Sequence, residues 1–374
     1  MKISQIEVFP LNLPMKQNFS ISSGSVGSQQ EGAPHVYVKI TSDSGFEGWG
    51  ECRPSHRWSY ETQESVVTTI NHYIKPVLLG ENPEDLEAIS LKMNKQIASG
   101  IAHGQPIAKA AIDMALHDLI GKHTGRRLSD LWFGTFKNEI ELSYLISTND
   151  PEEAYKKAEY AKNNGYLGVD VKVGLDPKKD IKIVEAVKEA APELFFRVDA
   201  NQAYNFPQAV RLASAMENIG VDVFEQPLSA GDLVGHAGLR RKTSIPIALD
   251  ESVWTPENMT QALRLEACDI VVIKVTKMGG LRKAKLCGEI AKAANVGLLG
   301  GGLTESSLAL TASAHLFNYL DIKTPVDLNG PIFLADDPVE YGPKINDGTV
   351  ELPDGYGIGC SISMDKINSF QVKK

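Results

Sequence analysis

Short apolar segments rich in β-branched residues alternate with amphipathic segments from about residue 139 onward. The strand-like segments include ELSYLIS, GVDVK, LFFRVD, DVFE, IPIALD and DIVVIK, and one of the intervening helical segments reads PEEAYKKAEYAKNNG. Strands that alternate with helices of this length predict βα units with a parallel sheet, and a long series of such units predicts a (β/α) barrel. Counted from ELSYLIS, the segment GLLGGG is the seventh strand and VDL is the eighth.

The first ~130 residues follow a different pattern. Two segments alternate like strands, and residues 64–80 and 108–125 have helical periodicity, which together predict an α+β domain. Residues 18–30, NFSISSGSVGSQQ, predict a mobile loop because they are rich in glycine and serine. We therefore divide the chain into an α+β domain at 1–133, a barrel at 134–330, and a segment at 331–374 that packs back on the first domain.

Composition excludes several classes of protein. The chain has 374 residues and a net charge of −9, without a basic stripe, which argues against binding to nucleic acid. No apolar run approaches the ~20 residues that span a bilayer, and the first residues lack the apolar core of a signal peptide. The 4 cysteines are scattered, so neither a disulfide framework nor a zinc site is indicated. A cytoplasmic protein is the simplest prediction.

Five charged residues each close one of the strand-like segments. They are Lys172, Asp199, Glu225, Asp250 and Lys274, at intervals of 27, 26, 25 and 24 residues. Strand ends at a steady βα spacing form the rim of a barrel at which such enzymes keep their chemistry. The alternative, five unrelated surface charges, does not explain why each one ends a buried-strand pattern.

Three of these rim residues are carboxylates. Asp199, Glu225 and Asp250 would repel one another if they converge, and a bound cation is the usual remedy. Oxygen ligands without a nearby His or Cys favour Mg²⁺, or Mn²⁺, over Zn²⁺. The alternative interpretation is that these carboxylates form ion pairs with Arg197 and the two rim lysines.

Lys172 and Lys274 close the second and sixth strands, on either side of the carboxylates. They would approach a central substrate from opposite faces and act as acid and base. Removal of a proton next to a carboxylate gives an enediolate, which a metal ion stabilises. The alternative role is a clamp for a phosphate or carboxylate, although no glycine-rich phosphate cradle accompanies them.

At these residues the chain resembles the enolase superfamily, specifically its muconate lactonizing enzyme subgroup. The motifs that carry the resemblance are VDANQ, FEQP, ALDES, IKVTKMGGL, GGLTESSLALTASAHLF and DLNGPIFL. The resemblance implies a (β/α)7β barrel with a capping domain from both termini, and a homo-oligomer. It also implies Mg²⁺ bound by Asp199, Glu225 and Asp250, with Lys172 and Lys274 flanking a small carboxylate substrate. The mandelate racemase-like branch uses a seventh-strand histidine, which GLLGGGLTES lacks.

One position departs from the subgroup. Its second strand normally reads Lys-x-Lys, whereas this chain has Asp170-Val171-Lys172. Asp170 and Lys172 point to the same side of the strand, so the carboxylate should raise the pKa of Lys172. Lys172 would then be a better proton donor than base. Alternatively, Asp170 pairs with Lys172 only in the resting state, or contacts a cationic group of the substrate.

The remaining candidates would contact the substrate. In this family, loops of the capping domain close over the barrel mouth. Here RPSHRWSYET offers a cationic and aromatic cluster of Arg53, His56, Arg57, Trp58 and Tyr60, suited to an anionic, planar substrate. Glu305 and Asp327 close the seventh and eighth strands. Related dipeptide epimerases carry Asp-x-Asp where this chain has DLN, whereas muconate lactonizing enzymes have an acidic residue followed by GP, as here. This comparison modestly favours a cycloisomerase-like relative.

Three functions follow from these observations. The first is a Mg²⁺-dependent isomerase, either a cycloisomerase of the muconate type or a racemase or epimerase of an amino-acid derivative or dipeptide. The second is a dehydratase that performs β-elimination on a hydroxy acid or a hydroxyproline-type substrate. The third is a metal-binding barrel that has lost its catalytic activity through Asp170.

Overall fold

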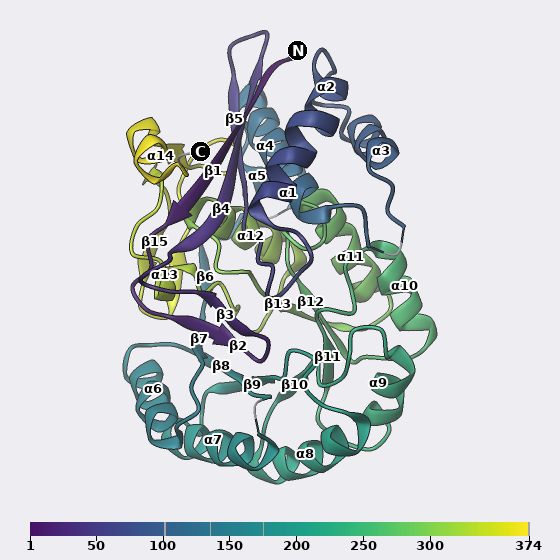
Figure 1. The fold of residues 1–374 in the computed structure, drawn as a ribbon, viewed down its shortest axis with the longest axis vertical. Helices are drawn as coiled ribbons and strands as arrows, with labels where there is room; N and C mark the ends of the chain where they lie inside the picture. The colour runs from purple at the N-terminus through teal and green to yellow at the C-terminus, as the bar shows by residue number, and fades with distance from the viewer. Residues whose placement is uncertain (101, 135, 175, 373–374) are drawn as a thin grey trace.

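The computed structural model describes residues 1–100, 102–134, 136–174 and 176–372. An N-terminal α+β domain lies against the open mouth of a barrel, and the end of the chain returns to the first domain (Figure 1). The predicted fold class, a barrel of (β/α)7β type with a capping domain, is confirmed.

The capping domain is built on an antiparallel sheet with the order β1-β4-β5. Its strands and helices are β1 (Ile3–Leu13), β4 (Ala33–Ser42), β5 (Glu47–Cys52), α1 (Gln63–Thr68), the π-helix η1 (Thr69–Ile74), α2 (Lys75–Leu78), α3 (Leu86–Gln96), α4 (Pro106–Thr124) and α5 (Leu128–Leu131). Helix α4 packs directly on β5 because Gly48 and Gly50 have no side chain. A Cβ at either glycine would lie 2.1 Å from a carbonyl oxygen of α4. The two predicted helical segments are confirmed.

The barrel sheet contains, among the described residues, seven parallel strands in sequential order. They are β7 (Ser143–Ile146), β8 (Gly168–Lys172), β9 (Phe195–Asp199), β10 (Val223–Glu225), β11 (Ile247–Leu249), β12 (Ile270–Ile273) and β13 (Gly297–Gly300). The predicted eighth strand is reduced to two parallel bridges, in which Val326 pairs with Leu142 and Asp327 with Gly301. These bridges close the ring between β13 and β7.

Helices surround the barrel, as Figure 1 shows most clearly for α6 to α11. They are α6 (Pro151–Asn163), α7 (Pro177–Ala190), α8 (Phe206–Ile219), α9 (Leu233–Arg240), α10 (Pro256–Arg264), α11 (Leu281–Ala293) and α12 (Ser307–Leu320). Most begin with a polar capping side chain; Asn205, for example, accepts a hydrogen bond from the backbone N–H of Gln208 at 3.0 Å. No helix among the described residues is long and apolar enough to cross a membrane.

Residues 18–30 form more structure than the sequence predicted. The expected loop contains an antiparallel hairpin of β2 (Phe19–Ile21) and β3 (Gly24–Gly27). Phe19 is buried and stacks on Phe333, with ring centroids 4.5 Å apart. Local composition indicated a loop, but a contact more than 300 residues away along the chain anchors the hairpin over the barrel mouth.

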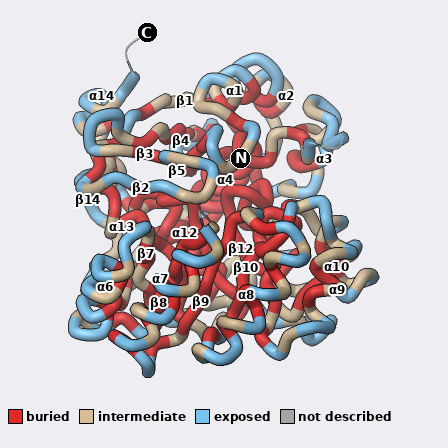
Figure 2. The backbone as a smooth tube through the Cα atoms, turned by 60° about the horizontal axis from the view of Figure 1, so that its bottom comes forward, coloured by how far each residue is buried: buried red, intermediate tan, exposed pale blue. Residues whose placement is uncertain are grey.

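The C-terminal segment contacts both domains. Its elements are α13 (Gly330–Phe333), β14 (Val339–Tyr341), β15 (Lys344–Asn346), β16 (Thr349–Glu351), β17 (Ser361–Ile362) and α14 (Met364–Phe370). Helix α14 packs on β1 of the capping domain, whereas β16 pairs with β6 (Glu139–Glu141), just before the first barrel strand. Figure 2 shows the buried residues concentrated in the middle of the molecule, where the domains meet.

A buried carboxylate joins the capping domain to the barrel. Glu51 of β5 accepts hydrogen bonds from the Ser306 backbone N–H at 2.8 Å, the Ser306 hydroxyl at 2.5 Å and the Ala309 N–H at 3.1 Å. Ser306 caps α12, so Glu51 also lies at the positive end of that helix dipole. Tyr37 completes the network with a short hydrogen bond to the Ser306 hydroxyl.

We expect Glu51→Gln to lower the free energy of unfolding by about 2–4 kcal/mol, because an amide NH₂ would face backbone donors in a buried site. Thermal and urea unfolding measure the loss. Glu47→Gln on the same strand is the matched control; Glu47 pairs with Lys39 near the surface and should cost less than about 1 kcal/mol. Equal losses in the two variants would contradict the role of Glu51.

Candidate active site

The five rim residues lie where the strand ends predict them. In the barrel sheet Lys172 pairs with Asp199, and Asp199 pairs with Glu225, so these three stand side by side at the ends of β8, β9 and β10. Asp250 directly follows β11 and Lys274 directly follows β12. All five side chains are buried.

All three carboxylates face cationic side chains. Asp199 accepts a hydrogen bond from Lys172 Nζ at 2.7 Å, and its other oxygen accepts one from the Asn201 backbone N–H at 2.8 Å. Glu225 forms an ion pair with Arg197, which is also buried. The ion pairs that the sequence left as an alternative are therefore present.

Asp250 is held by two lysines. Lys274 Nζ donates to Oδ2 at 2.6 Å, and Lys277 Nζ donates to Oδ1 at 2.5 Å and to the Asp250 carbonyl at 2.6 Å. Although burial opposes the charged form, these two ammonium groups hold the pKa of Asp250 below its ordinary value. Lys277 was not predicted; its position three residues after Lys274 in KVTK was the available signal.

The described residues contain no group of three or more His, Cys, Asp or Glu side chains already gathered as a metal site. The donor set nevertheless fits a hard divalent cation. Glu225 Oε1 is buried without a hydrogen-bond partner among the described residues. Burial raises the pKa of Glu225 well above its ordinary value, and the charges of Asp199 and Asp250 add to the rise. A cation bound between the three carboxylates would relieve this repulsion.

Asp170 lies beside Lys172, as the alternation of the strand predicted. Its Oδ2 atom accepts a hydrogen bond from Lys172 Nζ at 2.9 Å and lies 3.8 Å from the Arg197 guanidinium. Burial opposes the charge on Lys172, but Asp170 first and Asp199 second raise the pKa of the lysine well above its ordinary value. Asp170 thus favours the protonated lysine.

Asp170→Asn should shift the pH–rate profile to the acid side. Because removal of the negative charge lowers the pKa of Lys172, the Lys172-dependent step should lose its proton at lower pH. The profile is measured where chemistry limits the rate, with the exposed Asp365→Asn as control. An unchanged profile would show that Asp170 does not control the charge of Lys172.

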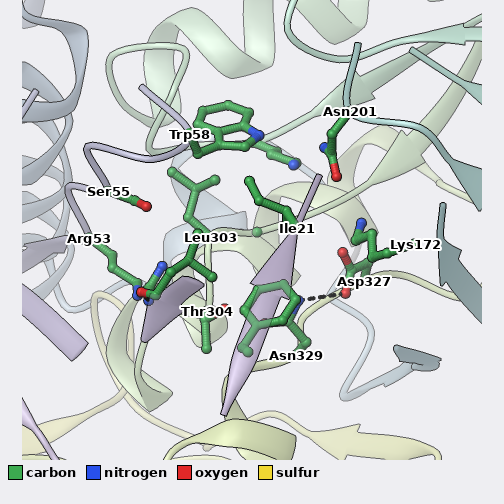
Figure 3. A pocket seen from close by; sticks show the side chains of 14 residues that line it. Ile21, Arg53, Ser55, Trp58, Lys172, Asn201, Leu303, Thr304, Asp327 and Asn329 are labelled. Atoms are coloured by element: carbon green, nitrogen blue, oxygen red, sulfur yellow. Dashed lines mark hydrogen bonds between the residues drawn. The ribbon is translucent and has the colours of Figure 1, made fainter. Parts of the chain in front are cut away.

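A cavity opens beside the two rim lysines (Figure 3). Its lining residues are Phe19, Ile21, Val26, Arg53, Ser55, Trp58, Lys172, Asn201, Lys274, Gly302, Leu303, Thr304, Asp327 and Asn329. The β2–β3 hairpin and the loop after β5 supply the capping-domain side. The C-terminal ends of the barrel strands supply the other side.

The predicted substrate-contacting residues divide into two groups. Trp58 and Asp327 line the cavity. The Trp58 ring lies 4.9 Å from Lys274 Nζ, and the Asn329 amide donates a hydrogen bond to Asp327 at 3.0 Å.

Glu305 is buried but is not part of the cavity lining. It accepts hydrogen bonds from the Thr276 hydroxyl at 2.8 Å and the Leu303 N–H at 2.5 Å.

Arg57 points away from this cavity. It is exposed and lines a separate surface depression together with His56. Arg53, four residues earlier, is the arginine of this loop that reaches the cavity. Asn201, the last residue of VDAN, also lines the cavity. It lies two positions after Asp199, so the alternation of the strand was a recognisable signal.

Two family comparisons cover both domains. Residues 5–132 match the mandelate racemase / muconate lactonizing enzyme N-terminal domain, and residues 153–366 match the enolase C-terminal domain-like family. The chain is 34% identical over 363 residues to an L-Ala-D/L-Glu epimerase of Clostridium acetobutylicum, which covers 96% of this chain and 98% of that one.

Solved structures agree along the whole chain. N-succinyl Arg/Lys racemase from Bacillus cereus superposes with a TM-score of 0.93 at 32% identity, covering 100% of this chain and 99% of its own. A dipeptide epimerase from Enterococcus faecalis, complexed with Mg and L-Leu-L-Tyr, gives 0.90 at 29% identity, covering 96% and 100%.

These relatives are isomerases, and the predicted class of enzyme is confirmed. The chain therefore belongs to the mandelate racemase and muconate lactonizing enzyme family of the enolase superfamily.

Proposed function

We propose that the protein is a Mg²⁺-dependent racemase or epimerase of an N-substituted amino acid or dipeptide. The observation that carries the proposal is the pair Lys172 and Lys274, both of which line the same cavity. They end the second and sixth strands of a ring with eight positions, and this separation around the ring supports a role on opposite sides of a bound substrate. Proton transfer on both faces of one carbon needs this arrangement.

Each lysine exchanges a proton between its Nζ atom and the α-carbon of the substrate. For one enantiomer Lys172 removes the proton and Lys274 returns one to the opposite face; for the other enantiomer the roles reverse. Trp58 lies over Lys274 and, with the hairpin residue Ile21, covers the cavity and limits access of water.

Asp199, Glu225 and Asp250 are the proposed ligands of Mg²⁺. The bound ion would supply positive charge to the substrate carboxylate and so stabilise the enediolate. The Mg in the Enterococcus faecalis relative supports this choice. Mn²⁺ accepts the same oxygen donors and is the proposed substitute.

Solvent exchange tests the proposed activity. The protein with Mg²⁺ is incubated in D₂O with both enantiomers of N-succinyl amino acids and with dipeptides, and the α-proton signal is followed by NMR. We expect deuterium incorporation together with inversion for at least one of these substrates. Products without deuterium at the α-carbon, or no exchange with any member of either set, would contradict the proposal.

One observation favours a second function. The Asp170–Lys172 ion pair favours a protonated Lys172, which suits a single proton delivery better than rapid transfer in both directions. Such a donor fits a cycloisomerase of the muconate type or a dehydratase that loses a hydroxyl group. Muconates and hydroxyprolines in the same screen, with products identified by mass, separate these reactions from racemisation.

A homo-oligomer in the cytoplasm is the remaining part of the proposal. The family resemblance supports the homo-oligomer. The scattered cysteines, which show no disulfide spacing, support a reducing compartment such as the cytoplasm. Light scattering after size-exclusion chromatography measures the oligomeric state, and a monomer at micromolar concentration would contradict it.

A further inference from the structure

Arg53 is a buried cation that the catalytic scheme above does not use. It directly follows β5, it is only 2% exposed, and it lines the cavity. One guanidinium nitrogen, Nη2, donates to the Val26 carbonyl at 2.7 Å. The buried Nε atom has no hydrogen-bond partner among the described residues. A buried donor without a partner is costly, which indicates a site that a ligand completes.

Arg53 stays charged in this position. Burial lowers its pKa to about 10, and the carboxylates of Glu305 and Glu51 act in the opposite direction. Both carboxylates are already occupied by other donors: Glu305 by Thr276 and a backbone N–H, and Glu51 by the cap of α12. Neither makes a direct ion pair with Arg53 within the described part of the chain.

The cavity has two polar ends. Figure 3 shows Arg53 on the opposite side from Lys172 and Asp327, with Leu303 and Ile21 between them. A ligand whose reacting carbon lies near the rim lysines would extend across an apolar middle and reach the Arg53 guanidinium. The group that arrives there must accept hydrogen bonds and carry negative charge.

We propose that Arg53 binds a second, distal carboxylate of the substrate and selects acidic substrates over their neutral analogues. This inference rests on the proposed function, which places the reacting carboxylate at the metal end of the cavity. The substrate class is then an amino-acid derivative with two anionic groups, such as a dipeptide with an acidic side chain or an N-acyl amino acid whose acyl group ends in a carboxylate. A guanidinium matches a carboxylate in shape and donates two parallel hydrogen bonds.

Equilibrium binding tests the inference independently of turnover. Isothermal titration calorimetry on the Mg²⁺-loaded protein compares L-Ala-L-Glu with L-Ala-L-Gln, and N-succinyl-L-alanine with its succinamoyl amide. The members of each pair have nearly the same shape but differ in one charge. We expect the acidic member of at least one pair to bind about 10- to 100-fold more tightly.

Variants locate the selecting residue. Arg53→Met should remove the preference for the acidic member of each pair. Arg53→Lys keeps the positive charge but cannot donate two parallel hydrogen bonds, so it should retain part of the preference. The exposed Arg126→Met is the matched control and should keep the wild-type ratio. Thermal unfolding shows whether Arg53→Met is folded; if it is not, the wild-type ratio and Arg53→Lys decide the matter.

Several results would overturn the inference. They are equal or undetectable binding of both members of both pairs by the wild type, a full preference retained by folded Arg53→Met, or a preference lost in Arg57→Met but not in Arg53→Met. The proposed function fails separately: a protein that prefers the acids but exchanges no α-proton in D₂O has the Arg53 site without the racemase activity.

Discussion

Lys172→Ala and Lys274→Ala should each lower the rate of racemisation by about 10²–10⁴-fold, the contribution typical of a positioned acid or base. The reason is that each lysine serves one face of the α-carbon, so neither variant can complete the transfer. Each variant should nevertheless exchange the α-proton of one enantiomer for deuterium, because the remaining lysine still reaches one face. Lys172→Ala and Lys274→Ala should exchange opposite enantiomers.

The measurement is α-proton exchange by NMR for each pure enantiomer in D₂O. Lys178→Ala, at the exposed start of α7, is the matched control and should exchange both enantiomers at the wild-type rate. If either active-site variant exchanges both enantiomers as fast as the wild type, that lysine is a binding residue and the two-sided mechanism is wrong.

Glu225→Gln should raise the dissociation constant for Mg²⁺ or Mn²⁺ by about 100-fold or more, because it removes the charge of the central carboxylate of the three. Glutamine keeps the volume of the side chain, and Arg197 keeps its contact with Asp170, so we expect the variant to fold. A chelator should abolish activity of the wild type, and added Mg²⁺ should restore it.

Metal affinity is measured directly, by titration of Mn²⁺ followed by electron paramagnetic resonance. Glu251→Gln is the informative comparison, since Glu251 is a neighbouring buried carboxyl whose pKa is raised to about 8, first by burial and then by Asp250. We expect it to lose less affinity than Glu225→Gln. The reverse order, or full activity in excess chelator, would contradict the assignment of the three ligands.

The rim of the barrel could be predicted from the sequence because strand periodicity is local. Each apolar run predicts a strand, and the charged residue after it marks where that strand ends. The alternation of side chains along the strand places Asp170 beside Lys172. The structure agrees, since the two side chains form a hydrogen bond of 2.9 Å. Arg197 was named from the sequence as a possible ion-pair partner of the rim carboxylates, and in the structure it pairs with Glu225.

Contacts between distant segments could not be predicted in this way. The hairpin at residues 18–30 is anchored by Phe333, and Glu51 binds the first turn of α12, so both depend on tertiary packing. Arg53 and Arg57 are equally basic on one loop, and only the turn between them decides that Arg53 enters the cavity. The eighth strand shrank to two bridges because VDL is followed at once by NGP, which begins α13.

Crystals soaked with Mn²⁺ distinguish a metal centre from a set of ion pairs most directly. Data collected at the manganese absorption edge should show a single anomalous peak in the barrel, within about 2.3 Å of one oxygen from each of Asp199, Glu225 and Asp250. Lys172 and Lys274 should then point towards the cavity on either side of the ion. The contrary result is a barrel without a peak, in which Asp199 and Asp250 keep their hydrogen bonds to the two lysines.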